Sequence, residues 1–132
     1  MSARRRTVEY QFVRRDPTIV LDFEQLRDMT LDDGSLMREI LAALLDDTAR
    51  QMTLLDQAIR ERNPQATRRL AHYSKGACAN VGANAAAAVL ESIESTAVNQ
   101  DFEACRSSLD ALALEMERLR VETNLTAGAP QA

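Results

Sequence analysis

The feature that most constrains this chain is a long stretch, residues 35–62, in which apolar side chains recur every three or four positions. That spacing follows the period of an α-helix and places the apolar side chains on one stripe of its surface. Such a stripe is typical of a long helix packed in a bundle. Its members are Met37, Ile40, Leu41, Leu44, Leu45, Thr48, Met52, Leu55 and Ile59.

Stop and start signals divide the rest of the chain into further helices. Asn63-Pro64 ends the long helix and begins the next one, because proline fits the first helical turn. We expect that helix to run to about Val81, a following one to span 85–98, and a last one to come after the break at 99–101. The inward stripe of the last helix consists of Cys105, Leu109, Leu112, Met116 and Leu119.

A short helix and two end segments complete the predicted organisation. Asp22 with Gln25 forms a capping box for a first short helix. Residues 1–20 form an N-terminal tail or extended arm, 21–124 the helical bundle, and 125–132 a disordered C-terminal end. We therefore predict an all-α fold, an antiparallel up-and-down four-helix bundle with a short additional N-terminal helix.

Composition supports this fold class and bears on function. Of the residues 45% are hydrophobic but only 4% are aromatic, so the core must be built from aliphatic side chains and alanines, which favours closely packed helices. The net charge of −4 gives no electrostatic reason for nucleic-acid binding. No segment approaches the roughly 20 apolar residues of a membrane span, and the basic start lacks the apolar core of an export signal. We expect a cytoplasmic protein that contacts no membrane.

The two cysteines, Cys78 and Cys105, fit no metal-ligand spacing. Both fall on apolar helical stripes, so we expect buried reduced thiols, and their spacing does not decide whether they form a disulfide. No metal site is predicted from these or other residues.

The chain contains a single histidine, His72. At 100° per residue, it falls with Lys75, Gly76, Ala79 and Ala83 on the side of its helix opposite the apolar stripe. A glycine and alanines on an exposed helical surface beside a histidine indicate a place where a partner can approach closely. A lone histidine is more often a surface or core residue without a chemical role, and that alternative stays open.

The run around His72 resembles the signature of histidine-containing phosphotransfer (HPt) domains. A looser resemblance, in helical spacing, extends from about Asp22 to Arg120, whereas Tyr73-Ser74 departs from the commoner Thr-Leu. The resemblance implies that the histidine exchanges a phosphoryl group with response-regulator receiver domains and with a sensor or hybrid histidine kinase, without a cofactor. The pattern Ala-His-x-x-Lys-Gly-x-x-x-Asn-x-Gly-Ala is met at Ala71, His72, Lys75, Gly76, Asn80, Gly82 and Ala83.

The residues near His72 suit this chemistry. Lys75, about one turn away, can compensate the charge that develops on the phosphoryl oxygens. Gly76 leaves room for a partner's active site to close over the imidazole. Three members of the predicted docking surface have simpler alternatives, because Gly82 can equally end the helix and the arginines at 68–69 can be merely solvated. That surface comprises Arg68, Arg69, Gly76, Ala79, Gly82 and Ala83.

Three functions compete on this basis. The first is a phosphorelay carrier, which is not an enzyme in its own right because no nucleotide-binding segment is visible. The second is an all-α interaction module in which His72 is incidental. The third is the dimerisation domain of a sensor kinase, in which an acidic residue usually occupies the position of Tyr73. We favour the carrier, and we expect a monomer because one chain supplies all four bundle helices.

Overall fold

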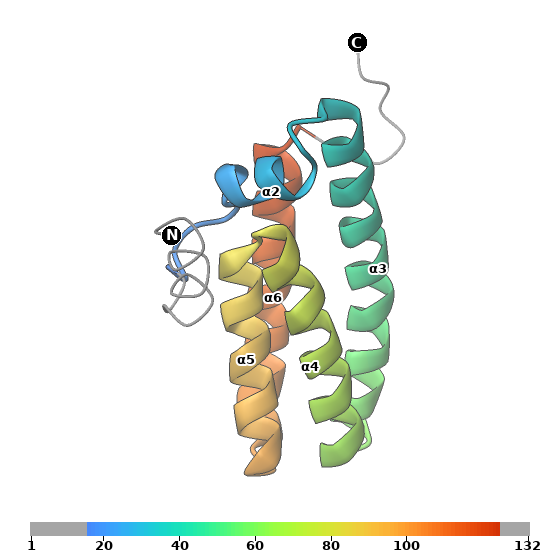
Figure 1. Cartoon of the computed structure of the whole chain (residues 1–132). Helices are drawn as coiled ribbons and strands as arrows, with labels where there is room; N and C mark the ends of the chain where they lie inside the picture. Colours follow the sequence, from blue (N-terminus) through green and yellow to red (C-terminus); the bar gives the residue numbers. More distant parts are fainter. Residues whose placement is uncertain (1–15, 125–132) are drawn as a thin grey trace.

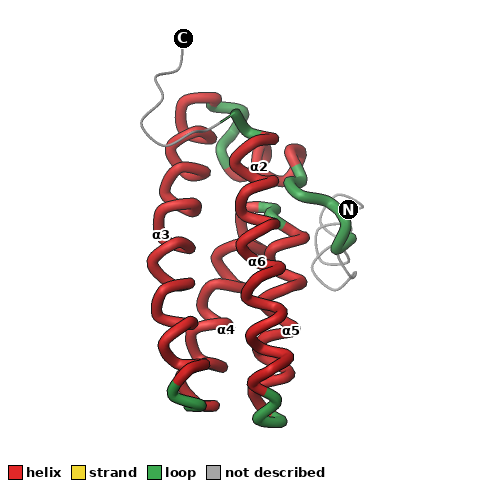
Figure 2. Tube along the Cα trace, turned by 180° about the vertical axis from the view of Figure 1, so that it is seen from behind, coloured by secondary structure: helices red, strands yellow, loops and turns green. Residues whose placement is uncertain are grey.

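The computed structural model describes residues 16–124, and within that range it contains helices and loops but no strand. Four long helices run side by side, and a short one crosses the end of the bundle where α3 begins and α4 ends (Figures 1 and 2). The predicted fold class is confirmed. The helices are α2 (Phe23–Met29), α3 (Gly34–Arg60), α4 (Pro64–Val81), α5 (Asn84–Val98) and α6 (Phe102–Glu122).

The predicted end segments lie largely outside this range. The extended arm over 7–13 and the C-terminal end at 125–132 fall outside the described residues. Residues 16–20 of the predicted tail do contact the bundle, because the backbone carbonyl of Ile19 accepts a hydrogen bond from Ala85 N at 2.9 Å. Among the described helices, none is both long and apolar enough to cross a membrane.

Side-chain caps fix where most of these helices begin. Asp22, Asp33, Asn63 and Asp101 each accept a hydrogen bond from the backbone N–H three residues later, at 3.0–3.1 Å. Such caps satisfy one of the free N–H groups of the first turn. The observed bounds differ from the predicted ones by no more than two residues, as at the long helix, which the spacing placed at 35–62.

The core lies between the four long helices and is almost entirely aliphatic. The predicted inward stripe of α6 is buried, as are the two cysteines, which are free thiols. Burial raises the pKa of the Cys78 thiol to about 11, so this group stays protonated at neutral pH. The largest fully buried side chains include Leu26, Leu55, Leu90, Ile93, Leu112 and Leu119.

The turn from α4 to α5 corrects one part of the sequence-based prediction. Gly82 ends α4 in the left-handed conformation at φ 98°, and its N–H donates to the carbonyl of Cys78 at 3.1 Å. Ala83 is completely buried, and Gly82 is buried as well. The helical wheel placed Ala83 on the exposed side, although the helix was expected to end at about Val81. The alternative that Gly82 ends the helix is confirmed. Neither residue can therefore line a docking surface.

Helix α2 is attached to this same turn. Asp22 N donates to the carbonyl of Gly82 at 2.8 Å. The Gln25 side-chain amide donates to the carbonyls of Ala79 at 2.8 Å and Asn80 at 3.0 Å. The Asp22 side chain accepts from Gln25 N, as the predicted capping box requires. The Gln25 side-chain amide in addition binds carbonyls of the last turn of α4, which have no donor further along that helix.

Candidate functional site

His72 lies on the outward side of α4, with 68% of its side chain exposed. The opposite side of the same helix is closed, because Ala71, Ser74 and Cys78 are each at most 1% exposed. The imidazole is therefore presented to solvent by a helix whose other face is fixed in the core. This placement agrees with the one expected from the spacing.

Glu94, on α5, holds the imidazole in place. Its Oε2 lies 2.8 Å from His72 Nδ1, and its Oε1 lies 2.7 Å from Lys75 Nζ. One carboxylate thus contacts both functional side chains predicted on α4. Glu94 was not among the predicted site residues, since it is 22 positions from His72 on another helix. The sequence signal that could have found Glu94 was its position directly after Ile93, which belongs to the buried stripe of α5.

The charge of Glu94 determines which nitrogen of the neutral imidazole carries the proton. Burial alone would raise the pKa of this carboxyl group, but hydrogen bonds from Lys75 and His72 outweigh it, and the pKa is lowered. The carboxylate is therefore ionised at neutral pH and can only accept hydrogen bonds. Nδ1 must then carry the proton, so the neutral ring has its free lone pair on Nε2. That nitrogen can act as a nucleophile.

The surface beside His72 is open on the side of Gly76. A Cβ atom built on Gly76 would have no heavy atom within 4 Å, so neither helix packing nor backbone conformation requires a glycine there. Ala79, one turn further along, is partly buried, and Arg68 and Arg69 are exposed at the other end of the surface. Four of the predicted docking residues therefore border the imidazole along α4.

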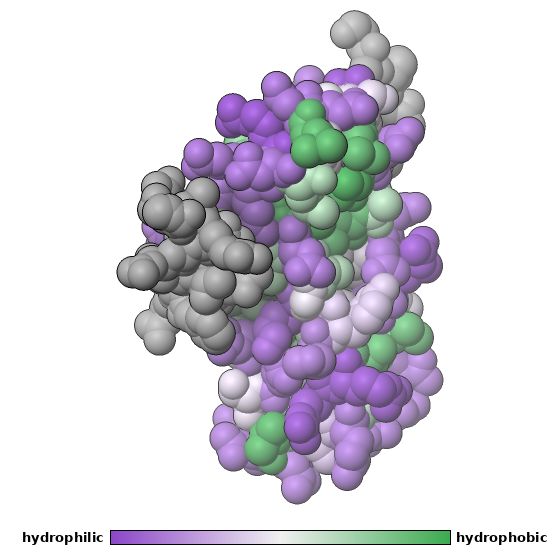
Figure 3. Space-filling model, in the orientation of Figure 1, coloured by the Kyte–Doolittle hydropathy of each residue, from purple (hydrophilic) through white to green (hydrophobic). Residues whose placement is uncertain are grey.

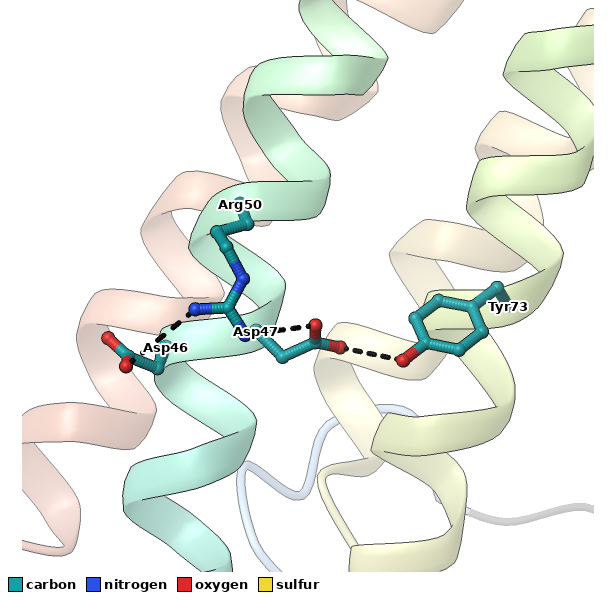
Figure 4. A network of polar contacts seen from close by, with 4 residues as sticks. All are labelled: Asp46, Asp47, Arg50 and Tyr73. Carbon is teal, nitrogen blue, oxygen red and sulfur yellow. Dashed lines mark hydrogen bonds and ion pairs between the residues drawn. The ribbon is translucent and has the colours of Figure 1, made fainter.

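A second polar network joins α4 to α3. The Tyr73 hydroxyl donates to Asp47 Oδ2 at 3.1 Å, Arg50 lies 3.3 Å from Asp47 Oδ1, and the same guanidinium is 3.8 Å from Asp46 (Figure 4). The hydrogen bond to Asp47 raises the pKa of Tyr73. Since α3 and α5 lie on opposite sides of α4 (Figure 1), the two networks tie Tyr73 to α3 and Lys75 to α5. Between them lies the exposed strip of α4, which consists of Arg68, Arg69, His72, Gly76 and Ala79.

Two other surface features lie apart from His72. Figure 3 shows apolar side chains gathered near the end where α2 and α3 meet. The exposed apolar residues of α2, of the loop after it and of the first turn of α3 are Phe23, Met29, Leu31 and Leu36. A shallow hollow of about 490 Å³ lies between the end of α3 and the start of α6, where Arg62 stacks over Phe102 at 5.0 Å. Within residues 16–124, no group of three or more potential ligands could hold a metal ion.

A comparison with protein-family models identifies one family, and a comparison with solved structures identifies a similar fold. A family model described as the Hpt domain matches residues 39–122. The crystal structure of histidine-containing phosphotransfer protein B from Pseudomonas aeruginosa PAO1 is similar, with a TM-score of 0.74 and 20% sequence identity, over 81% of this chain and 93% of that chain. At this identity the likeness concerns the fold. A search of curated proteins found no match.

Proposed function

Since this chain belongs to the Hpt domain family and is a phosphotransfer carrier of phosphorelay signalling, we propose that His72 carries the phosphoryl group and that Nε2 is the atom that accepts it. The observation that carries this proposal is the contact between Nδ1 and Glu94 at 2.8 Å. It assigns the proton to one ring nitrogen and leaves the other, exposed nitrogen free to attack phosphorus.

Lys75 is proposed to compensate the phosphoryl charge. Its side chain is 29% exposed and lies on the same helix one turn from His72, tied to Glu94. Phosphoryl transfer needs an in-line approach and a cation near the equatorial oxygens, more than it needs covalent chemistry by the protein. Its Nζ lies 2.7 Å from the Glu94 carboxylate that also contacts His72, and this closeness to the imidazole supports the proposed role.

Partners of this family are receiver domains and histidine kinases, and we propose that they dock along the exposed strip of α4. Gly76 and Ala79 offer little bulk there, so a partner's active site can close over the imidazole. Arg68 and Arg69 supply positive charge that complements the acidic phosphorylation site of a receiver domain.

The proposal has three further parts. The phosphoryl group comes from a partner, because the sequence shows no nucleotide-binding segment. The carrier acts as a monomer, since one chain supplies the four long helices of the bundle. It acts in the cytoplasm, where receiver domains are found.

The direct test is His72→Gln. A phosphorylated receiver domain, or potassium phosphoramidate as a small donor, should label the wild-type chain with an acid-labile, base-stable phosphoryl group. The variant should take up no label, because the nucleophile is gone. Its helicity and thermal unfolding should stay nearly unchanged, because the side chain faces solvent. Labelling that survives the substitution would place the acceptor elsewhere.

A further inference from the structure

We propose that Glu94 keeps a proton on Nδ1 of His72 while Nε2 carries the phosphoryl group, so that His72 departs as a neutral imidazole when the group moves on. This inference rests on the proposed role of His72 and assigns Glu94 as a positioning residue for both directions of transfer. It goes beyond the choice of tautomer in the resting protein, because it concerns the phosphorylated state.

The accepting step requires no proton transfer on this view. The Nε2 lone pair attacks phosphorus and forms the N–P bond. The bond from phosphorus to the carboxylate oxygen of a partner's acyl phosphate breaks, and its electron pair stays on that oxygen. Because Nδ1 retains its proton, the ring becomes an imidazolium cation. The Glu94 carboxylate, 2.8 Å away, balances that new positive charge.

The donating step is the same reaction in reverse. A carboxylate oxygen of the next partner attacks phosphorus, the N–P bond breaks, and its electron pair returns to Nε2. The leaving group is then a neutral imidazole with the proton still on Nδ1. If the ring had lost that proton, the leaving group would be an imidazolide anion, which is far more basic and departs much more slowly. Glu94 therefore keeps the carrier in its reactive form.

The surrounding charges single out Glu94 for this role. On α5 the other carboxylate, Glu91, lies one turn earlier and is exposed. On α3, Asp47 is occupied by Tyr73 and Arg50. The cations of α4 on or beside the exposed strip are Lys75 and the arginines at 68–69, and none of them can accept a proton from Nδ1. Among the described residues, Glu94 is the acceptor in contact with this nitrogen.

Lys75 explains why Glu94 stays ionised after the ring is phosphorylated. Its Nζ lies 2.7 Å from Oε1, so the carboxylate keeps one cationic partner whatever the state of the imidazole. Only 20% of the Glu94 side chain is exposed, so water competes weakly for the two contacts. The same geometry predicts that Lys75 must divide its charge between Glu94 and an incoming phosphoryl group.

The test compares phosphorylated wild-type protein with Glu94→Gln. Both are loaded with potassium phosphoramidate, which needs no docking surface, and the pH at which Nδ1 loses its proton is read from ¹⁵N chemical shifts of the phosphorylated ring. Glutamine keeps the shape but removes the charge. The midpoint for loss of the Nδ1 proton should therefore be lower in Glu94→Gln than in the wild type by about one pH unit or more. At pH values between the two midpoints, the variant should lose its phosphoryl group to water more slowly than the wild type.

Glu91→Gln is the matched control, because it removes an exposed carboxylate from the same helix, and its midpoint should equal that of the wild type. An equal midpoint in Glu94→Gln would overturn the inference while His72 remained the acceptor. Absence of label on wild-type His72 would instead overturn the proposed function. If Glu94→Gln fails to fold, Glu94→Asp tests the same point, because its shorter side chain loses the 2.8 Å contact and should also lower the midpoint.

Discussion

Gly76 lies within α4 and Gly82 caps its end, six positions further along, and the two are glycines for opposite reasons. Gly76 has ordinary helical backbone, and an added Cβ would meet no atom within 4 Å. Gly82 has φ 98°, and an added Cβ would lie 2.9 Å from the carbonyl oxygen of Asp22. The fold requires a glycine at 82 and leaves position 76 free, which suggests that a partner outside the chain is what requires a small residue there.

Among substitutions that test this contrast, the largest expected effect is on the stability of the fold, when Gly82 is replaced. Gly82→Ala should lower the free energy of unfolding by about 1–3 kcal/mol, because alanine is strained in the left-handed region and its Cβ meets backbone that cannot move aside. Urea unfolding measures this change. Gly34→Ala is the control, since its added Cβ meets no atom within 4 Å, and it should be neutral or slightly stabilising. Equal stability of the two variants would contradict the contrast.

At Gly76 the expected effect is on transfer. Gly76→Gln should slow phosphoryl exchange with a receiver domain by about tenfold or more, equivalent to about 1.4 kcal/mol, because the new side chain stands beside the imidazole. Stability should be equal or higher by up to about 1 kcal/mol, since glycine inside a helix is unfavourable. Loading from phosphoramidate should persist. Unfolding of this variant would show that position 76 serves helix packing after all.

The smallest expected effect concerns Glu94, which borders the same open strip. Its pKa in the folded protein lies below the ordinary 4.5, so its ionised form stabilises the fold above that pH, and the contribution is lost as the pH falls through the lowered value. Glu94→Gln should therefore cost a few tenths to about 1 kcal/mol near pH 7. In urea unfolding the difference from wild type should shrink toward pH 3, and a constant difference would exclude the ion pairs as its source.

The fold could be predicted because its signals are local. The apolar spacing of the long helix, the capping residue Asn63 and the following Pro64 all act within a few positions, so helix bounds came out within two residues. Buried stripes such as that of α6 follow from the same periodicity. Neither the helix bounds nor the buried stripes depend on which helices become neighbours in the fold.

The site was predictable only along α4 itself. His72, Lys75 and Gly76 share one helix face, and helical geometry places them together. Glu94 could not be assigned in the same way, because its contact depends on the register between α4 and α5, which periodicity does not determine. Ala83 was misplaced for a different reason, since a helical wheel assumes that the helix continues, whereas the left-handed backbone of Gly82 ends it one residue earlier.

The hydrogen bonds from α2 to the end of α4 have a consequence for the order of folding. Gln25 reaches Ala79 and Asn80 across more than 50 positions of the chain, so the last turn of α4 is completed by a segment that is synthesised long before it. The loop between them must close before that turn is finished, and the entropy of closure rises only slowly with length. The hydrogen bonds from Gln25 to this turn therefore form only once that loop has closed, although the helix itself can form earlier.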